Sequence, residues 1–388
     1  MPPDGIRVAG APARPWVLVA GAFLKTGAQD RANYALASFL AQRGDSVHVV
    51  AHSVGDTLQG ATLSRHIARR PIRSDLLGEP FLSRLGRRTA SGLQREAPHV
   101  VINGGNCNWN DVNWVHYVHA AYDRPLDGGM ARRVRMRLAH RRWLAAERRA
   151  FLNARLLIAN SKRTMRDLME KVGVPAERIR VIYCGIDPER FRQPDVGERD
   201  DTRQRLGWPL DRQIALFIGA LGDRRKGFDT VVNAWETLRR RARRAPLLMV
   251  VGSGSLLNEW QRGVTASGLH DSIRFLGFRN DIPQIVRAAD LLVAPTRYES
   301  YGLGVHEALC CGIPAIVSAD AGVAERYPRE LQHLLLDDPN DAEELADRIE
   351  ALGSDRTRGA QALELFGSTL RAYTWNDMAR DIANAVSE

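Results

Sequence analysis

The chain has few cysteines and no long apolar run, and both absences narrow its class. Its four cysteines, Cys107, Cys184, Cys310 and Cys311, include no C-x-x-C pair. This spacing fits neither a zinc site nor a disulfide framework, so we expect no metal centre. No apolar run approaches the roughly 20 residues that a membrane-spanning helix needs. The start of the chain lacks the pattern of a secretory signal. We therefore expect a cytoplasmic protein whose only membrane contact would be peripheral, at the inner face.

Lysine is also scarce, although the chain is basic. Lysine and arginine total 55 against 45 aspartates and glutamates, a net charge of +10, yet only Lys25, Lys162, Lys171 and Lys226 are lysines. Residues 1–205 carry 34 of the basic and 20 of the acidic residues, whereas the remainder carries 21 and 25. An excess of this kind favours an anionic partner: nucleic acid, a membrane surface or a phosphorylated substrate.

Short apolar runs alternate with helical patterns along both halves of the chain. Runs of this length typify strands of a parallel sheet that is buried on both faces. In the first half they lie at 16–20, 47–50, 100–102, 115–119, 156–159 and 179–182. In the second half they lie at 214–218, 247–251, 273–276, 291–294, 315–317 and 334–336.

The length of 388 residues, with 44% hydrophobic and 26% charged residues, predicts two globular domains. The fold class is α/β, with two Rossmann-like, doubly wound parallel-sheet domains facing a cleft. We expect an acceptor-side domain over 1–195 and a donor-binding domain over 196–372, with the polar stretch 193–201 as the linker. A terminal helix over 373–388 is expected to pack back on the first domain.

The segment from Ala294 to Pro314 carries the most chemistry. A strand ends at its start, a loop holds Glu299, and a helix begins near Gly304 with Glu307 in its first turns. The unpaired amides of a helix start favour an anion, and carboxylates accept hydrogen bonds from hydroxyls. A phosphate joined to a hydroxyl-rich group describes a nucleotide sugar. The alternative is a surface loop in which Glu299 is solvated and Glu307 only caps the helix.

The same segment resembles a known family. Glu299 and Glu307 form an E-x7-E pattern, and Ser300-Tyr301-Gly302-Leu303 follows the first glutamate. This is similar to the retaining family-4 glycosyltransferases, which have the GT-B fold. Five more segments resemble motifs of that family in the family's order: 160–161, 182–187, 219–227, 252–254 and 275–277. The resemblance extends from about Trp16 to Trp375.

The resemblance implies roles for the donor-domain residues. Glu299 would contact hydroxyls of the donor sugar and Glu307 those of the ribose. The backbone amides of residues 301–303 would face the diphosphate and sugar. Gly219 and Gly252 would lie in the family's two glycine turns beside the donor.

The family also neutralises the leaving diphosphate with an arginine and a lysine, which implies that no metal ion is needed. Lys226 is the matching lysine, but Ala220 stands at the arginine position. Arg224 and Arg225 are the candidates for the second cation, and we favour Arg225.

In the first half, residues 25–31 take the place of the family's Gly-Gly loop, with Gly27 kept and Ala28 in place of the second glycine. The predicted strand at 115–119 is where the family carries an active-site histidine. His119 is the first candidate and His116 the second. The alternative is that either histidine is merely packed.

We therefore expect a retaining glycosyltransferase that moves a hexose-type sugar from a UDP- or GDP-sugar to an acceptor hydroxyl, with no further cofactor. The product would be a glycan, a glycolipid or a glycosylated metabolite. A nucleotide-sugar epimerase or a phosphorylase on the same architecture is the alternative enzyme. A nucleic-acid-binding protein is the alternative from another class. Aromatic residues at only 7%, with no zinc motif, argue against nucleic acid as a partner.

A predicted helix over about 129–153 contains eight arginines and a single acid, Glu147. Met136, Leu138 and Trp143 give this helix apolar area. It could lie on an anionic membrane surface that presents a lipid-linked acceptor, or hold a phosphorylated acceptor. The alternative is a solvated helix face.

Overall fold

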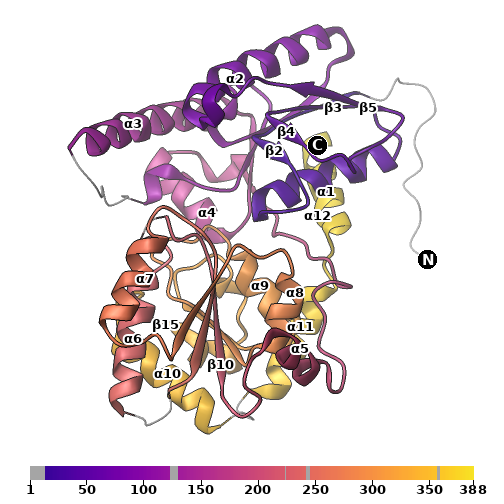
Figure 1. Ribbon diagram of the computed structural model, residues 1–388. Coiled ribbons are helices and arrows are strands. Elements are labelled where there is room, and N and C mark those ends of the chain that lie inside the picture. The colour runs from indigo at the N-terminus through magenta and orange to yellow at the C-terminus, as the bar shows by residue number, and fades with distance from the viewer. Residues whose placement is uncertain (1–13, 123–129, 223, 242–244, 356–358) are drawn as a thin grey trace.

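The computed structural model describes residues 14–122, 130–222, 224–241, 245–355 and 359–388. Figure 1 shows two domains, each built around a twisted sheet with helices on its faces. Every strand pair in the two main sheets is parallel. The predicted α/β class with two parallel-sheet domains is thus confirmed.

The first domain contains a seven-stranded sheet in the order β5-β3-β1-β6-β7-β8-β9. The strands are β1 (Trp16–Val19), β3 (Val47–Ala51), β5 (Leu63–Ile67), β6 (His99–Asn103), β7 (Val112–Val115), β8 (Leu156–Ala159) and β9 (Ile179–Val181). Two short strands, β2 (Ala22–Phe23) and β4 (Ser53–Val54), pair with each other. The α-helices of this domain are α1 (Ala28–Gln42), α2 (Asp75–Gly92), α3 (Met130–Asn153) and α4 (Lys162–Asp167).

The second domain contains a six-stranded sheet in the order β12-β11-β10-β13-β14-β15. Its strands are β10 (Ile214–Ile218), β11 (Leu247–Val251), β12 (Ile273–Gly277), β13 (Leu291–Ala294), β14 (Ala315–Ser318) and β15 (Leu335–Leu336). The helices around it are α5 (Glu198–Leu206), α6 (Phe228–Arg241), α7 (Leu257–Ala266), α8 (Ile282–Ala288), α9 (Leu303–Cys310), α10 (Ala342–Ser354) and α11 (Ala360–Arg371).

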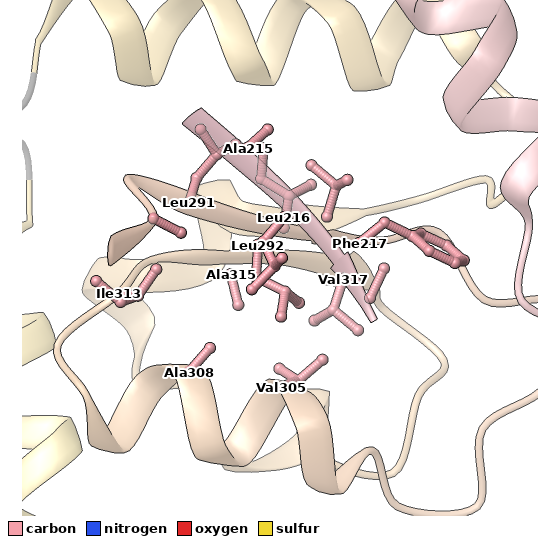
Figure 2. Close-up of a cluster of buried hydrophobic side chains, with 14 of the residues drawn as sticks. Ala215, Leu216, Phe217, Leu291, Leu292, Val305, Ala308, Ile313, Ala315 and Val317 are labelled. Atoms are coloured by element: carbon pink, nitrogen blue, oxygen red, sulfur yellow. The ribbon is translucent and has the colours of Figure 1, made fainter. Parts of the chain in front are cut away.

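The core of the second domain fixes the orientation of α9. Figure 2 shows Val305 and Ala308 of this helix facing side chains of the central strands, among them Leu292 and Val317. All four side chains belong to one buried apolar cluster. Burying a valine or leucine side chain contributes about 1.5–3 kcal/mol. The packing therefore holds the start of α9 at the carboxyl edge of the sheet.

The last helix packs on the first domain. Helix α12 (Trp375–Ser387) packs against α1, and Met378, Ile382 and Val386 are buried in the first domain's core. Thr374 caps α12 in a capping box with Asp377. Just before this cap, the chain runs beside residues 185–187, where Ile186 pairs with Thr374 in a parallel bridge.

One predicted boundary was wrong. The strand expected at 115–119 ends at Val115, and His119 begins a 3-10 turn. The Val118 amide donates to the Tyr298 hydroxyl (3.2 Å) and the His119 amide to Glu147 (2.9 Å), so neither amide pairs with a strand. Helix α5 begins at Glu198, within the predicted linker over 193–201.

The crossing at Gly185 gives a test of the fold. A Cβ atom at Gly185 would lie 2.3 Å from the Thr374 carbonyl oxygen, which is closer than atoms can approach. We expect Gly185→Ala to destabilise the protein by about 2 kcal/mol and to lower its thermal midpoint, because the α12 connection must shift. Gly263→Ala is the matched control, since that helical position faces open space and the change gains up to about 1 kcal/mol. Equal midpoints for the two variants would contradict this packing.

Candidate active site

The residues predicted to bind a donor gather at the carboxyl edge of the second sheet. Lys226 lies in the loop between β10 and α6, and Glu299 lies between β13 and α9. The Arg297 amide donates to the Arg225 carbonyl oxygen (2.8 Å), which ties the two loops together. Ligands of parallel α/β sheets bind at this edge.

Glu299 and Lys226 form an ion pair within the site. The Lys226 ammonium donates to Oε2 of Glu299, and the two side chains are only 18% and 15% exposed. Burial acts to raise the pKa of Glu299, but the charges of Lys226 and Arg225 outweigh it and hold the pKa below its usual value. Glu299 therefore stays ionised at neutral pH and can accept hydrogen bonds from hydroxyls.

The two neighbouring arginines point to different surroundings. Arg225 donates to the Tyr298 carbonyl oxygen (3.0 Å) and lies over the Tyr117 ring at 5.7 Å. Arg224 instead lies 3.4 Å from Asp229 and stacks on Trp260 at 5.5 Å. Arg225 thus lies close enough to act on Glu299, whereas Arg224 contacts Asp229 and Trp260 instead.

The predicted glycines form close turns around these side chains. Gly252 has φ 150°, and a Cβ there would lie 1.9 Å from the Gly219 carbonyl oxygen. Gly302 has φ 111° and is the N-cap of α9. A Cβ at Gly219 would lie 3.3 Å from Cγ of Lys226. The first two positions are strained for any side chain, and the third would crowd the lysine.

The side chains of residues 300, 301 and 303 do not point to a ligand. Ser300 donates to the His116 carbonyl oxygen (2.6 Å), and Tyr301 bonds Nδ1 of His306 (2.6 Å) inside the core. Leu303 is buried as well. If these residues contact a donor, they do so through their backbone amides at the start of α9.

Glu307 contacts the other domain. The Arg31 guanidinium, in the first turn of α1, donates to Oε1 of Glu307, whose side chain is 5% exposed. Burial raises the pKa of Glu307, and Arg31 counteracts part of that rise. Gly27, at φ 78°, is the N-cap of α1 and places Arg31 at the domain boundary.

His119 belongs to a histidine–carboxylate pair. Its Nδ1 lies 2.6 Å from Oε1 of Glu147 in α3. With Nδ1 donating to the carboxylate, Nε2 is left as the second ring nitrogen for a ligand. His116 lies nearby, and burial lowers its pKa to about 3. Both histidines line a pocket of about 220 Å³ in the first domain.

Within the described ranges, no group of three or more histidines, cysteines, aspartates or glutamates could hold a metal ion. No helix in those same ranges is long and apolar enough to cross a membrane.

The sequence patterns missed three site residues. Arg31 pairs with Glu307, Glu147 positions His119, and the Tyr298 hydroxyl binds the Val118 amide. For Glu147 a signal was present, because it is the one acid among eight arginines. Arg31 and Tyr298 each contact a residue of the other domain. A motif of neighbouring residues in the sequence does not indicate such contacts.

The chain is similar to known glycosyltransferases. A model of glycosyl transferases group 1 matches residues 198–364, and a model of glycosyltransferase family 4 matches residues 29–190. Mannosylfructose-phosphate synthase of Agrobacterium fabrum is 29% identical over 239 residues, covering 58% of this chain and 51% of the relative. A D-inositol 3-phosphate glycosyltransferase of Salinispora arenicola is 32% identical over 205 residues, covering 49% and 45%. The chain spans about half the length of these curated relatives.

Solved structures show the same fold at low identity. The sucrose-phosphate synthase of Thermosynechococcus elongatus superposes with a TM-score of 0.76 and 21% identity, over 96% of this chain and 98% of the other. HepE of Anabaena, solved with UDP and glucose, has a TM-score of 0.69 and 20% identity, over 97% and 100%. Two glycosyltransferase models that match both domains, on a fold shared with these enzymes, show that the chain belongs to the family-4 glycosyltransferases of the GT-B fold.

Proposed function

We propose that the protein is a retaining glycosyltransferase that moves a hexose-type sugar from a UDP- or GDP-sugar to an acceptor hydroxyl. The observation that carries this proposal is the cluster of Lys226, Arg225 and Glu299 beside the start of α9. It places two cations and a helix start next to an ionised carboxylate, which suits a sugar joined to a diphosphate. HepE, which shares the fold, was solved with UDP-glucose.

In this proposal the second domain binds the donor. Glu307 accepts hydrogen bonds from the ribose hydroxyls, and Glu299 accepts them from the sugar. The diphosphate lies against the first amides of α9, where the backbone N–H groups lack partners within the helix. Donor binding therefore requires Glu307 to exchange Arg31 for the ribose.

The leaving group is stabilised by Lys226 and Arg225 in place of a metal ion. The bond between the sugar's anomeric carbon and the diphosphate oxygen breaks, and the acceptor oxygen bonds that carbon on the same face. The acceptor proton passes to the departing phosphate oxygen. Negative charge grows on that phosphate in the transition state, so cations already in place lower the barrier.

We also propose that α3 holds the protein on an anionic membrane surface. Met130, Val134 and Leu138 are 78%, 50% and 57% exposed and follow one another at four-residue spacing, so they lie along one side of the helix. Exposed arginines at 133, 137 and 141 accompany this stripe. An apolar stripe with flanking arginines suits the interface of an anionic bilayer. This location would be the inner face of the membrane.

Donor binding tests the proposed function directly. A ligand that binds only the native state raises its stability, by about 2.7 kcal/mol at 100 times Kd. We expect UDP, GDP or one of their sugars to raise the thermal midpoint of the wild type, and Glu307→Ala to lose most of that rise. Glu330→Ala, at an exposed carboxylate elsewhere in the domain, should keep it. A wild type that no nucleotide or nucleotide sugar stabilises would refute the donor assignment.

The adjacent arginines give a matched pair for catalysis. With the donor found above, we expect Arg225→Ala to lower kcat by about 100-fold, as removing one charge-stabilising donor does. Arg224→Ala should stay within about threefold, because Arg297 still pairs with Asp229 at 2.8 Å. Equal losses of kcat, or a larger loss for Arg224→Ala, would contradict the assigned roles.

Metal independence gives a separate test. Sugar transfer should persist in excess EDTA, because Lys226 and Arg225 take the place of a metal ion. Loss of transfer in EDTA that added Mg²⁺ restores would contradict metal independence.

Vesicle flotation tests the membrane proposal. We expect the wild type to float with phosphatidylglycerol vesicles at low salt and to be released at high salt, because the attraction is screened. Reversing Arg133, Arg137 and Arg141 to Glu should weaken binding at least about 100-fold, at roughly 1 kcal/mol for each arginine. Reversing the exposed Arg262, Arg274 and Arg329 of the second domain makes the same change in net charge and should matter little. Equal binding of the two triple variants would exclude α3 as the contact.

A further inference from the structure

The pocket beside His119 has a composition that differs from the donor side of the cleft. Its polar lining includes His52, Glu79, Asn103, His119 and Glu147. None of the described residues that line it is an arginine or a lysine. In a chain with 55 basic residues, the described lining of this pocket contains two carboxylates and neither lysine nor arginine.

Glu79 is the group that most needs a ligand. Its Oε2 is buried and has no hydrogen-bond partner among the described residues. Burial raises the pKa of Glu79, against the weaker opposing charges of Arg142 and His119. Arg142 is exposed and is not part of the lining. A buried acceptor without a donor is costly, and a ligand hydroxyl would satisfy it.

Neither Glu147 nor His116 brings a positive charge to the pocket. Glu147 is 6% exposed and already accepts two hydrogen bonds from His119. His116 has a buried Nε2 without a partner in the described part of the chain. Because burial lowers the pKa of His116 to about 3, this ring is neutral at pH 7. A phosphate in the pocket would meet Glu79 without a lysine or arginine to neutralise it, and a like charge disfavours binding.

Aromatic rings and size limit the ligand further. Trp143 and Tyr117 both contact the His119 ring, at 5.5 and 4.7 Å between ring centroids, and both line the pocket. Such rings offer apolar faces for the C–H side of a sugar. The volume of about 220 Å³ is below the roughly 300–1,000 Å³ of sites for drug-sized ligands, so it admits one ring.

Tyr117 contacts both the cationic cluster and the pocket. Arg225 lies over one side of its ring, whereas the pocket with Glu79 is lined by the same tyrosine. The cations proposed to bind the diphosphate are thus next to the carboxylate pocket but do not line it. A ring held in the pocket would lie next to the donor side of the cleft.

We propose that this pocket is the acceptor subsite and that it selects an uncharged polyhydroxyl ring, a sugar or cyclitol carrying no phosphate on the ring that is bound. The proposal rests on the proposed glycosyltransferase function. Glu79 accepts hydrogen bonds from two ring hydroxyls, Asn103 and His119 contact others, and Trp143 covers the apolar face. Any anionic part of a larger acceptor lies outside the pocket.

Saturation-transfer NMR with matched ligands tests this selection. The probes are methyl mannoside, methyl glucoside and myo-inositol, each paired with its monophosphate, and all measured with UDP present. We expect at least one uncharged member to bind the wild type and its phosphorylated partner to bind at least tenfold more weakly. Stronger binding of the phosphorylated members, or binding of none of the six, overturns the proposal. Stabilisation by UDP in the same samples reports separately on the proposed function.

Variants of Glu79 locate the binding. Glu79→Gln should weaken the bound uncharged ligand about tenfold and leave the UDP shift unchanged. Glu96→Gln, at an exposed carboxylate of the same domain, is the matched control and should stay within twofold. Glu79→Arg should reverse the preference toward the monophosphates. Unchanged affinity in both Glu79 variants would place the ligand elsewhere and overturn the proposal.

Discussion

The structure depends on one segment, residues 298–302, that is hydrogen-bonded to both domains at once. Ser161 of the first domain donates to the Ser300 carbonyl oxygen (2.6 Å), and Ser300 donates to that of His116 (2.6 Å). From the second domain, the Gly322 amide donates to the Glu299 carbonyl oxygen (3.0 Å). A Cβ at Gly322 would lie 2.1 Å from the Ser300 carbonyl oxygen, so only glycine permits this approach. Because Glu299 is part of this segment, its position is set by both domains.

Two different electrostatic environments lie close to this segment. In one, Lys226 and Arg225 hold the pKa of Glu299 low and suit an anionic donor. In the other, Glu79 and Glu147 line a pocket without lysine or arginine among its described residues. The basic excess of the first domain is therefore not explained by that pocket. Much of it lies outside, including the exposed arginines of α3. Net charge over half the chain gave no guide to the charge of the pocket itself.

Most of the fold could be predicted because buried parallel strands are continuous apolar runs, as Val17 and Leu216 illustrate. Edge elements could not: β5 has the sequence Leu-Ser-Arg-His-Ile and is largely exposed, so it has no apolar run. Helix α2 contains Pro80, and α5 is almost entirely polar, which concealed both. In the site, the glutamates and Lys226 stand in local motifs, whereas Arg31 and Glu147 act on residues 276 and 28 positions away. Such pairs exist only after the sheets have formed.

The pairing of Arg31 with Glu307 couples the chemistry to the domain interface. Arg31 belongs to α1 and Glu307 to α9, so the ion pair joins the two domains. A buried carboxylate that loses its cation is left at a cost of several kcal/mol unless another donor replaces it. Ribose hydroxyls can satisfy Glu307 but cannot neutralise it, and the released guanidinium must find an anion. In the proposed donor complex, the diphosphate would supply that anion beside the same helix start. A complete nucleotide diphosphate would then satisfy both halves of the pair, whereas a nucleoside alone would satisfy only one.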